Sequence, residues 1–209
     1  MENNKETKQK LIDAALKLFK DPGYQDLTIE QLCETVGISK NTYYYYFESK
    51  EALLLACIGE QKTLTMQELS KILLSEPNHF EQLWLLYKKR IDFVMGCGAS
   101  FLRGLHSIKA IQCMDGAVKD KHEMLEIEID IIRKAQDAGE VRNKSEARAL
   151  TVATGMQFMG VLLVWVFWDG KFDLAEIFRS ALEATFDVPP EARQGGDLYA
   201  QSMSAMQLK

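Results

Sequence analysis

Hydrogen-bond donors are concentrated in one short stretch of the chain, "SKNTYYYYFESK", which spans residues 39–50. Four consecutive tyrosines lie in it, between Lys40 and Lys50. Successive side chains on a helix are turned by about 100°, so four neighbouring phenols cannot all be buried or all face one partner. A phenol can donate to a phosphate oxygen, and its ring can cover a sugar or the methyl group of thymine. The stretch therefore holds the residue types needed to contact a nucleic acid.

The four tyrosines divide between interior and surface if the stretch forms a helix. Tyr43 and Phe47 are four residues apart and share an inward face, whereas Tyr44 and Tyr45 point outward and Tyr46 lies at the margin. Two interpretations of the outward pair remain: contact with a DNA backbone, or packing against neighbouring helices. An inward Tyr43 needs a partner for its hydroxyl, because burying that group unpaired costs about 1–3 kcal/mol.

The residues before the tyrosines predict a second helix at a defined distance. Thr28 and Gln31 have the spacing of a capping box, so a helix is expected to begin at Thr28. Gly37 suits the residue that ends such a helix, and Ser39 suits the N-cap of the next one. Residues 28–46 are therefore expected to form a helix, a short turn that contains glycine, and a second helix. This order predicts helix-turn-helix geometry.

The rest of the chain has helical periodicity and no strand pattern, which predicts an all-α fold of about nine helices. A second capping box, Asn143 with Glu146, is expected to begin the most apolar helix. Breaks are expected at "DPGY" (21–24), "SEPN" (75–78), "GCGAS" (96–100) and "DGKFD" (169–173). The expected helices cover residues 5–20, 28–36, 39–47, 50–74, 80–95, 101–111, 118–138, 143–168 and 174–186.

Composition and charge narrow the class of protein. The chain has 209 residues and a net charge of −5 at pH 7, which is mildly unfavourable for a nucleic-acid binder. Its first 62 residues carry eight lysines, ten acidic residues and no arginine. Bidentate contact between arginine and guanine is therefore unavailable there, so we expect modest direct readout and a marked role for DNA shape.

Cysteine usage and hydropathy predict a cytoplasmic protein without a metal site or cofactor. The four cysteines (Cys33, Cys57, Cys97, Cys113) include no C-x-x-C pair, which favours reduced thiols. Residues 1–10 are too polar for a signal peptide. The most apolar run, 152–168, has 17 residues and is at the short limit for a membrane span. We therefore expect a buried helix and no membrane association.

The stretch "LTIEQLCETVGISKNTYYYYFESKEALL" resembles the DNA-binding domain of the TetR family of bacterial transcriptional regulators. The family pattern has a threonine that opens the second helix, followed by A-x-x-x-G-V-S-K-x-x-[LF]-Y-x-[HY]-F-x-[SN]-K-E-x-L. Departures are Cys33 in place of alanine, Ile38 in place of valine, Tyr43 in place of leucine or phenylalanine, and Glu48, which should weaken non-specific affinity. The matching residues are Thr28, Gly37, Ser39, Lys40, Tyr44, Tyr46, Phe47, Ser49, Lys50, Glu51 and Leu53.

The resemblance implies a ligand-responsive transcriptional regulator, with a repressor as the leading interpretation, that binds a palindromic double-stranded operator as a homodimer. It implies a helix-turn-helix DNA-binding domain at 1–50, a helical effector-binding and dimerisation domain at 51–188, and a polar tail at 189–209. The implied phosphate contacts are Thr28, Tyr45, Tyr46 and Lys50, and the groove-facing residues are Lys40, Asn41 and Tyr44, with Ser39 and Thr42 beside them.

The resemblance also implies that the last two long helices, at about 144–186, pair with those of a second subunit, and that a small-molecule effector binds among the middle helices. Methionine and aromatic residues there are either ordinary core or an adaptable pocket. We also expect an apolar or aromatic effector, and this expectation has less support than the paired helices and the effector site. The candidate ligand-binding residues are Tyr87, Ile91, Met95, Phe101, His106, Cys113, Phe158, Met159 and Leu162.

Three alternatives remain open at this point. One is a redox-sensing regulator that uses Cys97 or Cys113. Another is a helical interaction module that no longer binds DNA, which the acidic N-terminus and Glu48 favour and the Ser39, Lys40, Tyr44 and Lys50 set opposes. The third is an enzyme, but the sequence has no G-x-S-x-G, H-E-x-x-H or phosphate-loop motif and only three histidines, so we expect a non-enzyme.

Overall fold

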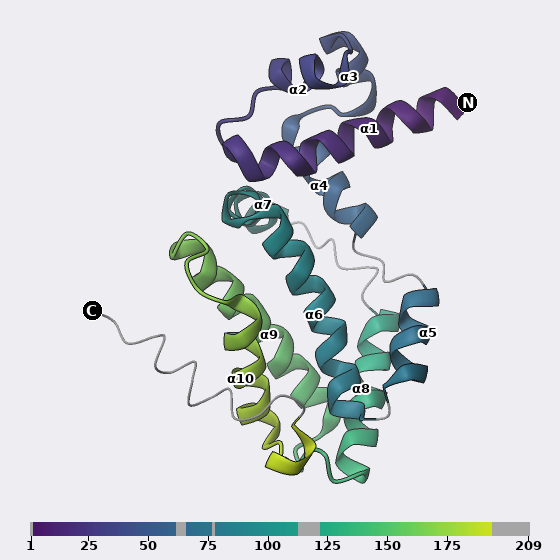
Figure 1. Cartoon of the computed structure of the whole chain (residues 1–209), viewed down its shortest axis with the longest axis vertical. Helices are drawn as coiled ribbons and strands as arrows, with labels where there is room; N and C mark the ends of the chain where they lie inside the picture. The colour runs from purple at the N-terminus through teal and green to yellow at the C-terminus, as the bar shows by residue number, and fades with distance from the viewer. Residues whose placement is uncertain (1, 62–65, 77, 113–121, 194–209) are drawn as a thin grey trace. The chain divides into compact units, whose positions relative to one another are not determined.

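The computed structural model describes residues 2–61, 66–76, 78–112 and 122–193, and within these ranges every regular element is a helix (Figure 1). The all-α prediction is confirmed. The chain divides into two compact units. The head unit comprises Met1–Leu64 with Phe93–Ala117, and the C-terminal unit comprises Thr65–Asp92 with Val118–Lys209.

Ten α-helices are described where about nine were expected. The difference arises in the predicted helix 50–74, which the structure describes as two helices with residues 62–65 outside the described ranges. One turn of π-helix (η1) and one of 3₁₀-helix (η3) complete the set. The bounds are α1 Glu2–Leu18, η1 Phe19–Gly23, α2 Ile29–Val36, α3 Lys40–Tyr46, α4 Lys50–Gln61, α5 Met66–Ser75, α6 His79–Cys97, α7 Ala99–Gln112, α8 His122–Asp137, α9 Ala147–Phe167, α10 Leu174–Phe186 and η3 Pro190–Ala192.

In the head unit, the helix-turn-helix forms where the capping residues predicted it. The Thr28 hydroxyl accepts from Gln31 N at 3.2 Å, while Thr28 N donates to the Gln31 side chain at 2.8 Å, so both halves of the capping box are present. Gly37 ends α2 with φ of 75°, a conformation that glycine adopts at little cost. Ser39 then caps α3 by accepting from Thr42 N at 3.1 Å. These contacts position α3 against α2.

The predicted break at "DPGY" is a π-helical turn, η1, that α7 contacts closely. Tyr24, which follows η1, is 7% exposed, and its backbone N–H donates to Ser100 Oγ at 3.0 Å. A Cβ atom at Gly104 would lie only 2.3 Å from Tyr24 Cδ1. Glycine at this position of α7 therefore lets the Tyr24 ring lie directly on the helix backbone.

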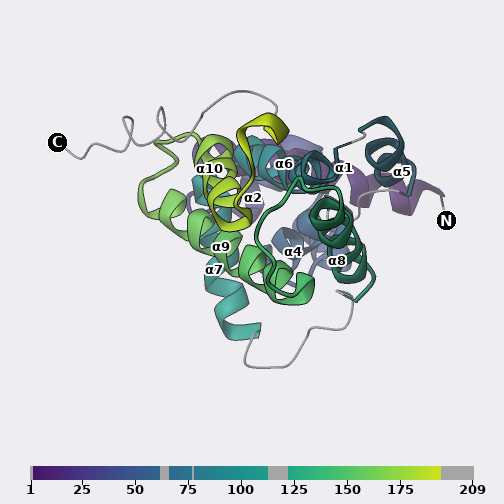
Figure 2. The same ribbon diagram turned by 90° about the horizontal axis from the view of Figure 1, so that it is seen from below.

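In the C-terminal unit, α9 packs against both α8 and α10 (Figures 1 and 2). Phe178 of α10 lies in an aromatic cluster, 5.1 Å from the Tyr87 ring and 5.0 Å from the Phe158 ring. Such offset and edge-on ring pairs add stabilisation to the burial of apolar area. The cluster joins α6, α9 and α10 into one core.

The capping box predicted from Asn143 and Glu146 is wrong. The N-cap of α9 is Glu146, whose side chain makes no capping hydrogen bond. The Asn143 amide instead donates to Thr185 O at 2.8 Å, and its Oδ1 accepts from Ser145 N at 3.0 Å. Asn143 thus fastens the loop before α9 to the end of α10, an interaction between residues 42 apart in the chain that local spacing could not predict.

A buried ion cluster joins α6 to α10. Arg179, whose side chain is 5% exposed, donates to both oxygens of Glu81 and through Nε to Glu183 Oε1 at 2.8 Å. Burial alone would lower the pKa of the Arg179 guanidinium, but the hydrogen bonds that it donates to Glu81 and Glu183 raise that pKa above its usual value. The guanidinium also stacks over Trp84, at 5.1 Å from the ring centre. The second cation near Glu183 is Arg193, whose Nε lies 3.6 Å from Glu183 Oε2.

Helix α9 buries one side and exposes an apolar stripe on the other. By length and composition it could cross a membrane, with a mean hydropathy of 1.8, but a core helix of a soluble protein passes the same test. The stripe follows a spacing of three and four residues, which places its members on one face. We call it the α9 stripe, and its members are Val152 (46% exposed), Met156 (71%), Met159 (45%), Leu163 (39%) and Phe167 (74%).

Candidate nucleic-acid interface

The tyrosine run divides as its helical directions predicted. Tyr43 is fully buried, and its hydroxyl donates to Ser49 O at 3.0 Å, so the phenol has the partner that burial requires. Tyr44 and Tyr45 are 52% and 72% exposed, and Tyr46 is half-buried. The alternative in which the outward pair packs against neighbouring helices does not hold for the described residues. Two phenols are therefore presented to solvent on the outer side of α3.

The Tyr43 hydroxyl provides a direct test of this division. We expect Tyr43→Phe to lower the free energy of unfolding by about 1 kcal/mol, because the Ser49 carbonyl loses its donor in a part-buried site. Tyr44→Phe removes the same atom from an exposed ring and should change stability little. Urea unfolding of both variants checks the prediction, and equal effects would contradict the inward assignment of Tyr43.

Lys40 opens α3 and is paired with an acidic residue of α2. Its ammonium donates to Glu30 Oε1, and the two side chains are 53% and 54% exposed. The hydrogen bond from Lys40 lowers the pKa of the Glu30 carboxyl, and the same bond raises the pKa of Lys40. Within the sequence of α3, KNTYYYY, Lys40 is the one cationic residue. The Lys40 ammonium is therefore already paired with the Glu30 carboxylate of α2.

Lys50 has several intramolecular hydrogen-bond partners. Its Nζ donates to Tyr24 O at 2.6 Å and to Leu27 O at 2.8 Å, with Gln25 O at 3.5 Å, and it lies 4.4 Å from the centre of the Tyr24 ring. Burial lowers the pKa of Lys50 from its usual value. In this conformation the ammonium stabilises the loop that leads into α2. The phosphate contact predicted for Lys50 therefore stays a prediction.

The remaining predicted contact residues lie at the ends of α2 and α3. The hydroxyls of Thr28 and Ser39 serve as N-caps, and Thr42 Oγ1 lies 2.9 Å from Ser39 Oγ. Asn41 is exposed beside Tyr44 and Tyr45. Helix α3 thus brings together Lys40, Asn41, Tyr44 and Tyr45 as exposed hydrogen-bonding side chains within two turns.

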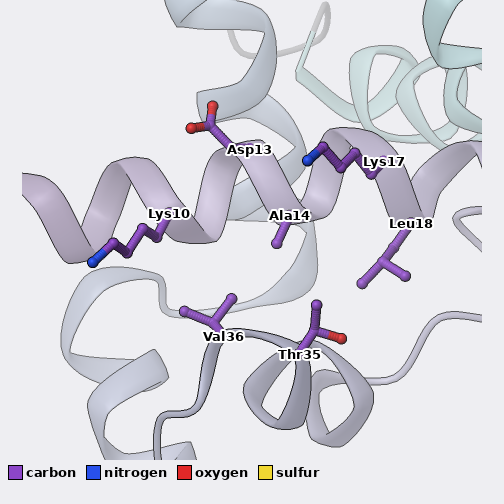
Figure 3. A pocket seen from close by; sticks show the side chains of 7 residues that line it. All are labelled: Lys10, Asp13, Ala14, Lys17, Leu18, Thr35 and Val36. Atoms are coloured by element: carbon purple, nitrogen blue, oxygen red, sulfur yellow. The ribbon is translucent and has the colours of Figure 1, made fainter.

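A hollow of about 420 Å³ lies elsewhere in the head unit, between α1 and the last turn of α2 (Figure 3). None of the predicted DNA contacts lines it. A second hollow, of about 390 Å³, lies in the C-terminal unit beside α5, α6 and α8. The first is lined by Lys10, Asp13, Ala14, Lys17, Leu18, Thr35 and Val36, and the second by Leu73, His79, Gln82, Glu126, Ile127, Asp130, Ile131 and Lys134.

The predicted ligand-binding residues do not line either hollow. Phe101 is buried in the head unit, with its ring 5.6 Å from that of Phe19, and Met95 of the same unit is 39% exposed. Cys113 and the side chain of His106 lie outside the described residues. In the C-terminal unit, Tyr87, Ile91 and Leu162 are buried, Phe158 is half-buried and Met159 is exposed. An effector site built from these residues stays a prediction.

Cys97 is a poor candidate for a redox sensor. Its thiol is 4% exposed, and burial raises its pKa to about 12. Cys33, Cys57 and Cys97 are all buried, and none of the three is in a disulfide. Because the thiolate is the reactive form, a high pKa suppresses oxidation and alkylation. The redox alternative therefore loses Cys97, while Cys113 lies outside the described residues.

We expect Cys97 to resist alkylation in the native protein. A rise of the pKa from 9.0 to about 12 reduces the thiolate fraction near neutral pH by roughly a thousandfold, before access is considered. Iodoacetamide labelling followed by peptide mass spectrometry, with and without urea, measures this. Native labelling of Cys97 as fast as that in urea would contradict the buried, protonated thiol.

A capped helix-turn-helix with an exposed polar face on its second helix, joined to a helical unit, defines the class of DNA-binding transcriptional regulators. Residues 11–57, from within α1 to within α4, match the profile described as "Bacterial regulatory proteins, tetR family". This match shows a DNA-binding domain of the TetR family within residues 11–57.

Two relatives from Bacillus subtilis (strain 168) show how far the similarity extends. The uncharacterized HTH-type transcriptional regulator YuxN is 42% identical over 55 residues, which is 26% of this chain and 19% of that protein. The fatty acid metabolism regulator protein is 20% identical over 180 residues, which is 83% of this chain and 90% of that protein. High identity thus extends over only about a quarter of the chain in the first relative, whereas weak similarity to the second covers most of the chain.

A solved structure supports the fold over both units. The transcriptional regulator FadR from Bacillus subtilis, in complex with stearoyl-CoA, has a TM-score of 0.55 and 22% identity to this chain. The match covers 85% of this chain and 97% of that one. At this identity the likeness is one of fold.

Proposed function

We propose that this chain is a ligand-responsive transcriptional repressor that binds a palindromic operator as a homodimer. The observation that supports it most is α3, which presents Lys40, Asn41, Tyr44 and Tyr45 from a capped helix-turn-helix. In this geometry the second helix enters the major groove, and tyrosines contact phosphates. Residues 1–50 then read DNA, and residues 51–188 bind the effector and the second subunit.

Selection of random duplex DNA by the purified protein tests the DNA-binding part. The variant Asn41→Ala with Tyr44→Ala removes two exposed side chains, so we expect its head unit to stay folded. Lys50→Ala is a poorer control because Lys50 also holds the loop before α2. We expect an enriched palindrome that the double variant loses. No enrichment at about 50 mM salt, where counterion release favours binding, would reject the proposal and favour a helical module that does not bind DNA.

The α9 stripe supports the homodimer. Five large apolar side chains on one face of a helix form a patch of the kind that marks a protein interface. A twofold dimer that pairs α9 and α10 with their copies would cover the stripe with an identical surface. Two recognition helices would then lie about one DNA turn apart, or a small multiple of about 34–36 Å.

Charge placed in the stripe should give a monomer. We expect wild-type protein at micromolar concentration to sediment as a dimer and the Met156→Lys, Phe167→Lys variant to sediment as a monomer, because like charges would meet across a twofold axis. Leu74→Lys is the matched control, since Leu74 is 87% exposed on α5, away from α9. A monomeric wild type, or a dimeric double variant, would contradict the α9 interface.

For the effector we propose an apolar or aromatic small molecule that binds within the C-terminal unit and weakens DNA binding. The support is the aromatic cluster of Tyr87, Phe158 and Phe178 and the fold shared with a regulator solved with stearoyl-CoA. Stearoyl-CoA is therefore the first probe, tested by release of the selected duplex. Release by small, highly charged compounds and not by apolar ones would overturn this part. A cytoplasmic location and the absence of enzymatic activity belong to the same proposal.

A further inference from the structure

Glu30 lies where an acidic residue is unexpected on a DNA-contacting surface. It occupies the first turn of α2, two residues after the cap residue Thr28. An acidic side chain there interacts favourably with the positive end of the helix dipole. Its carboxylate, however, also accepts from the ammonium of Lys40, across to the first residue of α3. The contact joins the two helices of the helix-turn-helix through their solvent-exposed ends.

The pair limits what the α3 cation can do. Lys40 is the one cationic residue of α3, and Lys50 donates to backbone carbonyls of its own unit. A phosphate contact from Lys40 requires the ammonium to leave Glu30, or requires the phosphate to approach the Glu30 carboxylate. Both reduce the gain from binding any phosphate backbone. A base edge in the groove is different because it is uncharged and the Glu30 carboxylate does not repel it as it repels a phosphate. The Lys40 ammonium has three protons, of which Glu30 accepts one, so it can donate to the base without leaving Glu30.

We propose that Glu30 is a specificity-determining residue, which positions Lys40 for a base contact and weakens its attraction to phosphates. This inference rests on the proposed DNA-binding function. Specificity is a ratio of affinities, and a repulsive group against the wrong partner raises that ratio as well as an attractive group for the right one does. The first 62 residues carry no arginine, so they lack the strongest base contact. Weakening the sequence-independent attraction to phosphates therefore helps to preserve discrimination between DNA sequences.

The test compares binding of a mixed-sequence duplex with binding of the selected palindrome, over a range of salt concentrations. We expect Glu30→Gln to bind the mixed-sequence duplex about two- to fivefold more tightly, the range that release of an exposed ion pair allows. The log–log salt slope should steepen by about 0.9 per head as Lys40 gains a phosphate. Affinity for the selected palindrome should change little, so discrimination falls.

Matched variants distinguish the effect of breaking the Glu30–Lys40 ion pair from the effect of removing one negative charge from α2. Glu34→Gln removes the same charge from the exposed side of the same helix, one turn away, and should leave the salt slope unchanged. Glu30→Asp keeps a carboxylate and should restore part of the discrimination. In a Lys40→Gln background, Glu30→Gln should have no further effect on the slope. Thermal unfolding of each variant measures how much stability is lost with the interaction between residue 30 and the helix dipole. This loss can then be separated from the effect on DNA binding.

The outcomes distinguish this inference from the function on which it rests. If wild-type protein selects no duplex, the proposed DNA binding fails. If it selects a palindrome and Glu30→Gln behaves as Glu34→Gln does in affinity and salt slope, DNA binding stands and the role of Glu30 is overturned. An effect of Glu30→Gln that persists without Lys40 also overturns it, because the carboxylate would then act on DNA directly.

Discussion

Arg179→Met is expected to destabilise the C-terminal unit by about 3–5 kcal/mol, because it leaves two buried carboxylates without their main partner. Glu81 and Glu183 are 4% and 2% exposed, and both receive hydrogen bonds from Arg179. Urea unfolding measures the loss. Arg148→Met is the matched control, since its ion pair with Glu126 is exposed and should contribute at most about 1 kcal/mol.

The loss in Arg179→Met should also depend on pH. Burial penalises the ionised form of a carboxylate that has lost its main cation, so the variant loses stability as the pH rises and these carboxylates ionise. Its deficit should therefore shrink as the pH is lowered from neutral towards 5. Adding Glu81→Gln and Glu183→Gln to the variant should recover stability at neutral pH. A deficit independent of pH and unrelieved by these changes would contradict the electrostatic explanation.

Gly104→Ala is expected to lower the free energy of unfolding of the head unit by about 1–3 kcal/mol through overpacking. The new Cβ would lie 2.3 Å from the Tyr24 ring, which is buried against Phe19 at 5.3 Å. Moving that ring disturbs the stacked ammonium of Lys50 and thereby the loop before α2. Affinity for the selected duplex should fall together with stability.

Replacing another glycine of the same unit by alanine is expected to leave the free energy of unfolding unchanged or to raise it. Gly96 lies in the last turn of α6 in the same unit, and a Cβ there would meet no atom within 4 Å. Gly96→Ala should therefore be neutral or stabilising by up to about 1 kcal/mol, as helix propensity predicts. Replacing Tyr24 by alanine should relieve the effect of Gly104→Ala. If both glycine variants behave alike, the close approach of Tyr24 to α7 is not the cause.

Local patterns predicted the head well because its signals are short in range. The Thr28–Gln31 box, the Gly37 end and the Ser39 cap each depend on residues three or fewer positions apart, or on one backbone angle. The directions of Tyr43 and Tyr44 follow from helix geometry alone. Capping and periodicity therefore sufficed to orient α3 and to identify its exposed side chains.

Predictions failed where a distant partner decided the outcome. Asn143 has the local spacing of a cap, but the Thr185 carbonyl takes its amide. The intramolecular partners of Lys50 were not predicted either, because three carbonyls of the loop before α2, at least 23 residues earlier in the chain, lie within 3.5 Å of its ammonium. Its phosphate contact stays a prediction. The Glu30–Lys40 pair joins residues ten apart on two helices. Sequence could have suggested that pair only once the angle between α2 and α3 was known.

The effector site could not be predicted from residue types. Methionine and aromatic residues at helical spacing fill a core as readily as they line a pocket. Phe101 and Tyr87 both have this character, yet Phe101 belongs to the core of the head unit and Tyr87 to the core of the C-terminal unit. Their division between two units depends on long-range packing that periodicity does not encode.

The α9 stripe would make gene control depend on the number of molecules in the cell. In a dimer built on this surface, protomers at low concentration separate, and the concentration of dimers then rises with the square of the total. Occupancy of an operator would follow the dimers, so a modest change in synthesis would give a steeper change in repression. Protomers left alone would expose Met156 and Phe167 to proteases and to one another, which would shorten their lifetime.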